Sequence, residues 1–295
     1  MTKIDRNIID LFQKNRGKIH RELSKELQIL STDYNFLIIH NGNAGDALIV
    51  SACAQILEKL NIKFRTLHEK KVIKKAKNTT FFLAGGNLTS EWNCEEWLLP
   101  LLSNCQKLCI FPSTFGKMEN FFSALRPQDV IFCRDYESYN LLTECAVKCK
   151  LYISPDVAFS FETKKYMLLK NTNLKLIVKI LIFQTFHFMR RLKHTYLYAF
   201  RNDLEKNQLL NLERKYLNDI SLLGHTSSSN LNNINNVTSN FLYLCSKYDS
   251  VHTDRLHVLI GALLVGTPLI NFSDTKDKKI SRVLRTFCQI LSEEL

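Results

Sequence analysis

Between residues 35 and 160, short apolar runs alternate with stretches of helical periodicity, and no other feature of the sequence constrains the fold as much. Strands that alternate with helices pair in parallel, so this pattern predicts a doubly wound α/β sheet. The predicted strands cover residues 36–40, 64–68, 80–84, 108–112, 130–134 and 151–154, and the predicted helices cover residues 45–60, 91–103 and 136–146.

The remaining residues predict a linker and a second, smaller α/β unit. Residues 174–192 are apolar but carry basic residues at spacings of three to five, which predicts a helix with one basic stripe. Such a helix either packs between domains or lies on a membrane surface, and both interpretations stay open. The predicted strands are residues 196–200, 220–223, 250–253 and 269–272, the helices are 202–212, 237–248, 255–265 and 278–291, and a mobile loop rich in Ser, Thr and Asn covers 224–240. The predicted domains are residues 1–160, which begin with an amphipathic helix over 1–15, a basic linker helix over 161–195, and residues 196–295.

The composition is that of a soluble globular protein, with 45% apolar and 23% charged residues. No signal peptide is visible and no apolar run is long enough to span a bilayer, so a cytoplasmic location is expected. The nine cysteines include no CxxC pair, which favours buried free thiols over a zinc site or disulfides. The net charge of +12 favours phosphates, acidic glycans or anionic lipids as partners. Nucleic acid is disfavoured because aromatic residues do not interleave the basic clusters.

Gly, Asn and Asp residues follow several of the predicted strands. In a parallel sheet the carboxyl ends of the strands share one edge, and ligands bind there. Each group taken alone is ordinary turn chemistry, but their recurrence at one edge predicts a single cleft. The groups are His40 to Asp46, Gly85-Gly86-Asn87, Pro112-Ser113-Thr114, Arg134-Asp135 and Pro155-Asp156.

The run Asp254-Arg255-Leu256-His257 stands where a polar stretch meets an apolar helical run. A helix N-terminus offers free N–H groups and a partial positive charge, so Arg255 and His257 would complete a site for a small dianion. Residues two apart diverge on a helix, so both side chains reach one ligand only if the backbone is still extended at Arg255. The alternative is a plain helix cap at Asp254 with two solvated neighbours.

Taken together, these motifs resemble those of the polysaccharide pyruvyl transferase family. The resemblance covers residues 35–161 and 196–287 and depends on the order of the motifs rather than on any one of them. The matching residues are Asn43, Gly45 and Asp46, then Gly85 to Asn87, Phe111 to Thr114, Arg134 with Asp135 and Ser138, Ser154 to Asp156 with Phe159, Arg201 with Asp203, and Asp254 to His257 with Gly266 and Pro268.

The resemblance implies two Rossmann-like domains that face each other across a cleft, as in GT-B glycosyltransferases. It implies transfer of a pyruvyl group from phosphoenolpyruvate to two hydroxyls of a sugar in a cell-surface polysaccharide or its precursor. The sequence shows no metal-binding cluster and no P-loop, so no metal and no cofactor are expected. His257 is then the expected general acid, because histidine exchanges protons near neutral pH. Asp46 is expected either to contact the acceptor hydroxyls as a base or only to cap a helix, and Asp156 to hold a turn. The expected substrate-binding residues are Arg255, Arg201, Asn43, Gly45, Gly85, Gly86, Asn87 and Arg134.

Two other functions are compatible with the sequence. One is a GT-B-type glycosyltransferase that uses a nucleotide sugar, although its usual acidic ribose contact and second glycine-rich turn are not clear here. The other is a catalytically silent relative that binds an anionic glycan or a membrane through its basic residues. A lipid-linked glycan acceptor would fit peripheral contact of a cytoplasmic enzyme with the membrane, mediated by residues 174–192.

Overall fold

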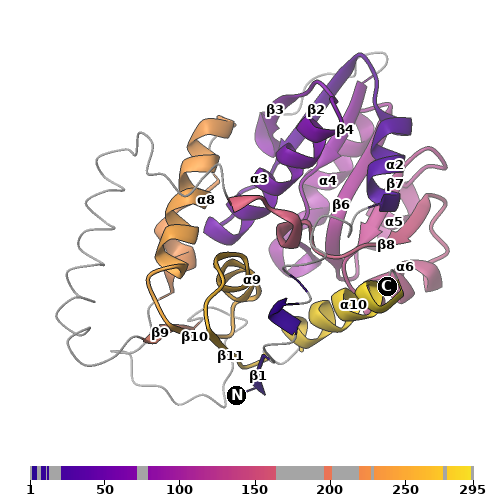
Figure 1. Ribbon diagram of the computed structural model, residues 1–295. Coiled ribbons are helices and arrows are strands. Elements are labelled where there is room, and N and C mark those ends of the chain that lie inside the picture. The colour runs from indigo at the N-terminus through magenta and orange to yellow at the C-terminus, as the bar shows by residue number, and fades with distance from the viewer. Residues whose placement is uncertain are drawn as a thin grey trace.

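The computed structural model describes residues 2–4, 8–10, 12, 21–71, 79–163, 196–200, 219–226, 229–274 and 278–293. These residues form a larger and a smaller β-sheet with helices packed around them (Figure 1). The α/β class predicted from the sequence is confirmed. The predicted basic helix over 174–192, the predicted helix over 202–212 and Arg201 lie outside the described residues, so the predicted domain limits at 160 and 195 stay predictions.

The larger sheet follows the predicted alternation closely. Its strand order is β3-β2-β4-β6-β7-β8, every pair in it is parallel, and the short strand β5 (Asn87–Leu88) pairs with β6. Pro112 to Thr114 were expected in a turn but lie inside β6, because that strand continues to pair through a register shift between Ile110 and Ser113. The main strands are β2 (Tyr34–Ile39), β3 (Arg65–His68), β4 (Thr79–Leu83), β6 (Lys107–Phe115), β7 (Val130–Cys133) and β8 (Lys150–Ile153).

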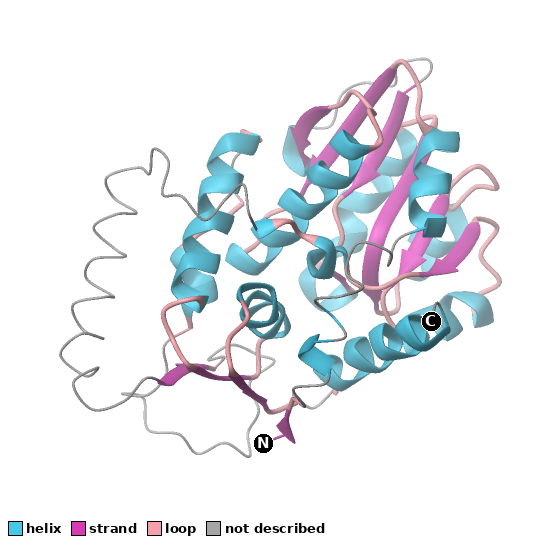
Figure 2. Cartoon of the chain, in the orientation of Figure 1, coloured by secondary structure: helices cyan, strands magenta, loops and turns pink. Residues whose placement is uncertain are grey.

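Helices cover both faces of this sheet (Figure 2). Alternate strand residues point to opposite faces. Phe82 and Phe132 accordingly share a core with α2 (Arg21–Leu30) and α3 (Ala44–Lys59), whereas Phe81 and Ile131 share a core with the helices of the other face. The helices of that face are α4 (Cys94–Ser103), α5 (Glu119–Ala124) and α6 (Tyr136–Glu144), and the 3₁₀ turns η1 (Glu69–Lys71), η2 (Ser90–Trp92) and η3 (Val157–Ser160) complete the connections.

The smaller sheet has the order β1-β11-β10-β9. β9 (Tyr196–Ala199), β10 (Ser250–Thr253) and β11 (Leu269–Phe272) are parallel, and β1 (Thr2–Lys3) pairs antiparallel with β11. The helix predicted from residue 1 is therefore wrong for Thr2 and Lys3. Their backbone groups pair with a strand from the other end of the chain, and a two-residue strand carries no periodicity that a sequence pattern could reveal. The helices α8 (Leu231–Cys245) and α9 (Leu256–Val265) belong to this part, whereas the last helix, α10 (Lys279–Glu293), runs back to α6 beside the larger sheet (Figure 1).

Two other expectations for this part of the chain are wrong. The loop predicted over 224–240 contains the start of α8, because the Asn230 side chain accepts from the N–H groups of Asn232 and Asn233 and caps the helix. Ile234, Thr238 and Phe241 then form one buried stripe along it. The strand predicted over 220–223 is the 3₁₀ helix η6 (Ile220–Leu223), whose first turn is capped by Asp219 through the Ser221 N–H group.

Helix α3 joins the two parts of the molecule. Nearly all of its residues are buried, which is typical of a helix that is covered on every side. It lies between the larger sheet and α8 (Figure 1), and the Ser51 hydroxyl lies 2.9 Å from the hydroxyl of Thr238 on α8. One hydrophobic core continues from the larger sheet through α3 into α8 and α9. The two sheets are therefore held in a fixed relation along α3.

Most of the cysteines are buried free thiols, as the sequence predicts. Seven of the nine are buried and all nine are unpaired. Burial raises the pKa of Cys105 to about 11 and that of Cys149 to about 12, so these thiols stay protonated at neutral pH. In the part of the chain that the structure describes, no helix is long and apolar enough to cross a membrane.

Candidate active site

A cleft of about 780 Å³ lies between the two sheets. The chain passes from β2 outward to β3 and then returns to β4 on the other side of β2, so the larger sheet has its switch point between β2 and β4. Ligands bind at such points in open parallel sheets. The wall from the larger sheet includes His40, Asn43, Asp46, Glu69, Asn87, Trp97 and Arg134, and the opposite wall includes Leu222, His225, Asp254, Arg255, His257 and Lys279.

The start of α9 brings Arg255 and His257 into this cleft. Arg255 is the N-cap of α9 and has an extended backbone, with φ −98° and ψ 117°. An extended backbone at Arg255 was required for the side chains of Arg255 and His257 to reach one ligand. Both side chains do line the cleft. The plain cap at Asp254 is wrong, because Asp254 precedes the N-cap residue.

The guanidinium of Arg255 is anchored by Asp219. Its Nε donates to Asp219 Oδ2 at 2.9 Å, its Nη2 donates to the same oxygen, and both side chains are 8% exposed. The other carboxylate oxygen of Asp219 caps η6, so a single buried carboxylate fixes both the turn and the arginine. This partner was not foreseen, because Asp219 carries no motif and lies far from Arg255 in the sequence.

His257 packs directly on the first turn of α3. A β-carbon placed on Gly45 would lie 2.7 Å from Cβ of His257 and 2.8 Å from its Nδ1. Glycine is therefore the residue that lets α3 approach the imidazole so closely. The structure thus brings the N-x-G-D loop and His257 together across the cleft.

On its other side, the imidazole of His257 faces Asp156. His257 Nε2 lies 3.5 Å from Asp156 Oδ2, and that nitrogen is buried with no other hydrogen-bond partner among the described residues. The His257 side chain is still 15% exposed, so the exposed part of the ring lies away from Asp156. With a proton on both ring nitrogens the imidazole is a cation, and this contact is then an ion pair.

Asp156 also binds Arg134. The Arg134 Nη1 donates to Asp156 Oδ2 at 2.6 Å, and both side chains are almost completely buried. Burial acts most strongly on the pKa of Asp156 and raises it, but Arg134, His257 and the Ala158 N–H group together hold that pKa well below its ordinary value. Asp156 is therefore a carboxylate at neutral pH. It does hold a turn, as expected, by capping η3 through Ala158.

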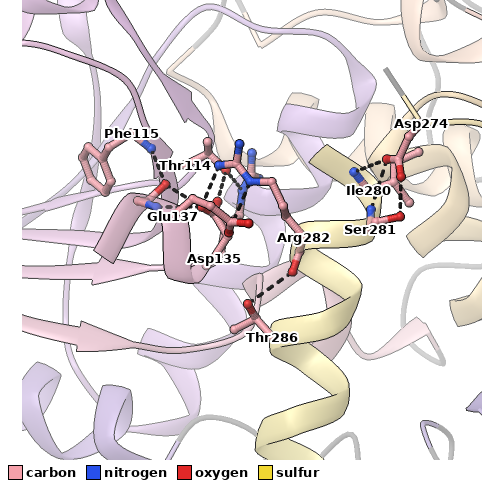
Figure 3. Close-up of polar contacts among 11 residues, drawn as sticks. Thr114, Phe115, Asp135, Glu137, Asp274, Ile280, Ser281, Arg282 and Thr286 are labelled. Carbon is pink, nitrogen blue, oxygen red and sulfur yellow. Dashed lines mark hydrogen bonds and ion pairs between the residues drawn. The ribbon is translucent and has the colours of Figure 1, made fainter. Parts of the chain in front are cut away.

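Further along this edge of the sheet, the network reaches α10. The Thr114 hydroxyl accepts from Arg134 Nε at 2.9 Å and donates to Asp135 Oδ2 at 2.6 Å. Arg282 on α10 then donates to Asp135 Oδ1 at 2.8 Å (Figure 3). Burial opposes ionisation of Asp135, but Arg282, Thr114 and Ser138 together keep its pKa below the ordinary value. His257 and Arg282 therefore hold the two ends of one buried network.

The loop after β2 forms the floor of the cleft. Asn43 caps α3 by accepting from the Gly45 N–H at 2.7 Å, and Asp46 Oδ2 accepts from the Asn43 N–H at 2.8 Å. Asp46 therefore does act as a cap, through one oxygen, and it also lines the cleft. Thr226 fixes the loop from the opposite wall, since its hydroxyl donates to the His40 carbonyl at 2.7 Å.

The remaining predicted residues differ in how they reach the cleft. Asn87 lines it directly. Gly86 lies under His40, whose Nε2 would be 3.0 Å from a β-carbon on that glycine, whereas Gly85 packs against the Pro112 carbonyl. Glu69 and Trp97 also line the cleft but were not predicted there, and His40, which belongs to the predicted edge group His40 to Asp46, was given no role of its own. The only signal for them was their position after predicted strands or on a predicted helix.

Metal ligation finds no support in the described ranges, where His, Cys, Asp and Glu side chains do not gather in any group of three or more. The absence of a metal or cofactor requirement stays a prediction.

The fold and the cleft define an α/β protein with a ligand site at the carboxyl edge of its parallel strands. The family model of polysaccharide pyruvyl transferase matches residues 43–275, which is most of the chain. The chain therefore belongs to the polysaccharide pyruvyl transferase family, a family of enzymes.

The fold is shared with a solved structure. The crystal structure of a functionally uncharacterised protein from Klebsiella pneumoniae resembles this chain with a TM-score of 0.70 and 22% sequence identity, over 91% of this chain and 94% of that one. At this identity the likeness concerns the fold alone. Comparison with curated protein sequences gave no match.

The contact between Gly45 and His257 leads to a testable expectation. Gly45→Ala is expected to reduce stability by about 1–3 kcal/mol through overpacking and to reduce transferase activity by displacing His257. A matched control is Gly261→Ala on α9, where the new β-carbon would lie 2.9 Å from Cε1 of Phe241, away from the cleft. Urea unfolding and activity assays on both variants separate the two effects. Equal loss of activity in both would show that the Gly45 contact has no special role.

Proposed function

We propose that this enzyme transfers the pyruvyl group of phosphoenolpyruvate to two hydroxyls of a sugar in a polysaccharide or its precursor and forms a cyclic ketal. The observation that carries the proposal is the placement of His257 in the cleft, between the Arg134–Asp156 pair and the Gly45–Asp46 turn. This arrangement combines a proton donor, buried cations and a nearby carboxylate in one site.

Three basic side chains of the cleft favour an anionic pyruvyl donor. Arg134, Arg255 and His257 all line the cleft, and the two guanidinium groups are each fixed by a carboxylate. A planar guanidinium suits the carboxylate and phosphate groups of phosphoenolpyruvate. Holding these cations in place before the donor binds lowers the entropic cost of binding.

The proposed reaction balances without an external oxidant or reductant. His257 gives a proton to C3 of phosphoenolpyruvate, which becomes the methyl carbon, and one sugar hydroxyl oxygen bonds to C2. The bond between C2 and the phosphate oxygen then breaks, and the second hydroxyl oxygen bonds to C2. The two hydroxyls release two protons; one restores His257 and the other leaves with inorganic phosphate.

Asp46 is proposed to receive the sugar hydroxyl proton that then leaves with inorganic phosphate. Its Oδ2 is used by the helix cap, while its Oδ1 lies 3.9 Å from the position of a β-carbon on Gly86, at the floor of the cleft. A carboxylate fixed by one oxygen keeps the other in a defined position for a substrate. Asp46 also directly follows Gly45, so it lies close to His257.

The arrangement of the two sheets across one cleft supports a GT-B-like architecture as part of the proposal. The cleft, like the ligand site in that architecture, lies between two units built from parallel strands. A cytoplasmic location, a lipid-linked acceptor and peripheral membrane contact are further expectations, and the residues expected to touch a membrane lie outside the described ranges.

Phosphate release tests the proposal directly. The purified enzyme is expected to release inorganic phosphate from phosphoenolpyruvate only when a suitable acceptor is present, and a panel of sugar nucleotides and lipid-linked sugars identifies that acceptor. Mass spectrometry should then find the ketal on the acceptor. If no acceptor in the panel supports release, while a nucleotide sugar acts as a donor, the glycosyltransferase alternative is correct instead.

Arg255→Ala is expected to raise the KM for phosphoenolpyruvate about 10–100-fold, because a hydrogen bond to a charged group contributes about 1.5–3 kcal/mol. Asp219→Asn is the matched control. It keeps the cation and can still cap η6, so the KM should rise less than in Arg255→Ala. An unchanged KM in Arg255→Ala would remove this residue from donor binding.

A further inference from the structure

We propose that Trp92, Trp97 and His40 form a platform on which a pyranose ring of the glycan acceptor stacks. This inference rests on the proposed function and assigns one end of the cleft to the acceptor. Trp92 and Trp97 both line the cleft, and they are the two tryptophans of the chain. Nothing in the family motifs involves them.

The exposure of Trp92 is the first observation. Its side chain is 47% exposed on the 3₁₀ turn η2, where it faces the cleft. Leu222, on the opposite wall, is 54% exposed. Large apolar side chains exposed together in a concave site are typical of ligand contact. Trp92 and Leu222 therefore offer apolar surface to a ligand in the cleft.

The second observation is the fixed stack of Trp97 on His40. The two ring centroids are 6.1 Å apart with an interplanar angle of 26°. The His40 ring is held in turn, since its N–H can donate either from Nε2 to the Gly85 carbonyl at 3.2 Å or from Nδ1 to the Asn41 carbonyl at 3.1 Å, depending on the tautomer. The pair is thus a rigid aromatic surface, and rigid surfaces bind with little loss of conformational entropy.

Charge separates this end of the cleft from the end that suits phosphoenolpyruvate. Glu69 lines the cleft beside the aromatic residues, and its Oε2 accepts from the Asn41 N–H at 2.8 Å. Carboxylates repel a dianion but accept hydrogen bonds from neutral hydroxyls. Glu69 and Asp46 therefore favour a polyhydroxylated ring here, whereas Arg134, Arg255 and His257 favour an anion.

Asp46 connects the two ends. The Oδ1 atom of Asp46 lies near Gly86, and Gly86 packs against the His40 ring. The residue before Asp46, Gly45, contacts His257. A pyranose stacked on Trp97 and His40 would accordingly present its hydroxyls to Asp46, within reach of the donor carbon beside His257. The apolar C–H face of the ring would cover the aromatic surface, and its hydroxyl edge would meet the carboxylates.

Intrinsic fluorescence tests this placement without catalysis, because both tryptophans of the chain line the cleft. Trp92→Phe leaves Trp97 as the only reporter, and Trp97→Phe leaves Trp92. The probes are methyl pyranosides of glucose, galactose, mannose and N-acetylmannosamine, with uridine as a nucleobase probe and no phosphoenolpyruvate present. At least one glycoside is expected to shift or quench the emission of both reporters in a saturable way. A response to uridine alone, or to none of the probes, would overturn the assignment.

Acceptor kinetics provide the second test. Trp92→Ala and Trp97→Ala are each expected to raise the KM for the acceptor about 3- to 10-fold, which corresponds to one aromatic contact, with little change in the KM for phosphoenolpyruvate. The corresponding Phe variants should retain most of the affinity. Tyr34→Ala is the matched control, since Tyr34 is an aromatic residue with 62% exposure at the amino end of β2, remote from the cleft. Equal effects on both substrates would overturn the platform, whereas glycoside binding without any phosphate release would contradict only the proposed reaction.

Discussion

His257→Ala is expected to reduce kcat for pyruvyl transfer by about 10²–10⁴-fold, which is the usual contribution of a positioned general acid. The KM for phosphoenolpyruvate should change much less, because Arg134 and Arg255 stay in place to bind the donor. Steady-state phosphate release at saturating acceptor measures both constants. The large expected effect follows from the position of the imidazole between Asp156 and Gly45, because glycine has no acidic proton and Asp156 is an ionised carboxylate at neutral pH.

His225→Ala is the matched control for this experiment. His225 lines the same wall of the cleft, is exposed, and pairs through its backbone with Asn43. Its replacement should therefore leave kcat within a few-fold of the wild-type value, since it removes a histidine from the cleft without touching Asp156. Urea unfolding checks that both variants are folded. Comparable kcat values for His257→Ala and the wild type would remove His257 from the chemistry.

The larger sheet could be predicted from the sequence because its signals are local. Short apolar runs followed by turn residues mark most of its six main strands, and the limits of all six lie within three residues of the predicted ones. β1 and β5 were missed because two residues carry no period. The start of α8 was missed because its Asn-rich composition resembles a loop, whereas burial of Ile234 and Phe241 against the rest of the core stabilises a helix.

The cleft could be predicted in outline for a topological reason. Carboxyl ends of parallel strands share one edge, so the glycine loops and Arg134 had to meet there once the sheet was known. The pairing of charges could not be predicted. Arg282 and Asp135 are 147 positions apart, and the partners of Arg255 and His257 depend on how the second sheet docks on α3. The aromatic residues at the other end carry no spacing signal at all.

Asp156→Asn is expected to lower the free energy of unfolding by about 3–5 kcal/mol, because it leaves the buried guanidinium of Arg134 without its anion. The amide oxygen can still accept from the Ala158 N–H group, so the cap of η3 should persist and the cost should come from the charge. Urea unfolding of the wild type and the variant measures the difference. In the Arg134→Met background the same Asp156→Asn change should cost much less, since no buried cation remains to be stranded. If Asp156→Asn lowered the free energy of unfolding equally in the wild type and in Arg134→Met, Arg134 and Asp156 would not be energetically coupled.

The pH dependence of this difference provides an independent check, and its direction follows from the pKa of Asp156. Because the folded state holds that pKa below its ordinary value, Asp156 contributes stability that is fully present above the unfolded-state pKa of about 3.9 and is lost as the pH falls through the folded-state value. The difference between the wild type and Asp156→Asn should accordingly stay constant from neutral pH down to about pH 5 and narrow in more acidic solution. A difference that narrowed toward alkaline pH instead would show that Asp156 is protonated in the folded enzyme. The same carboxylate could then not serve as the anion that faces a protonated His257, and the proposed role of the Arg134–Asp156 pair in holding the general acid would have to be abandoned.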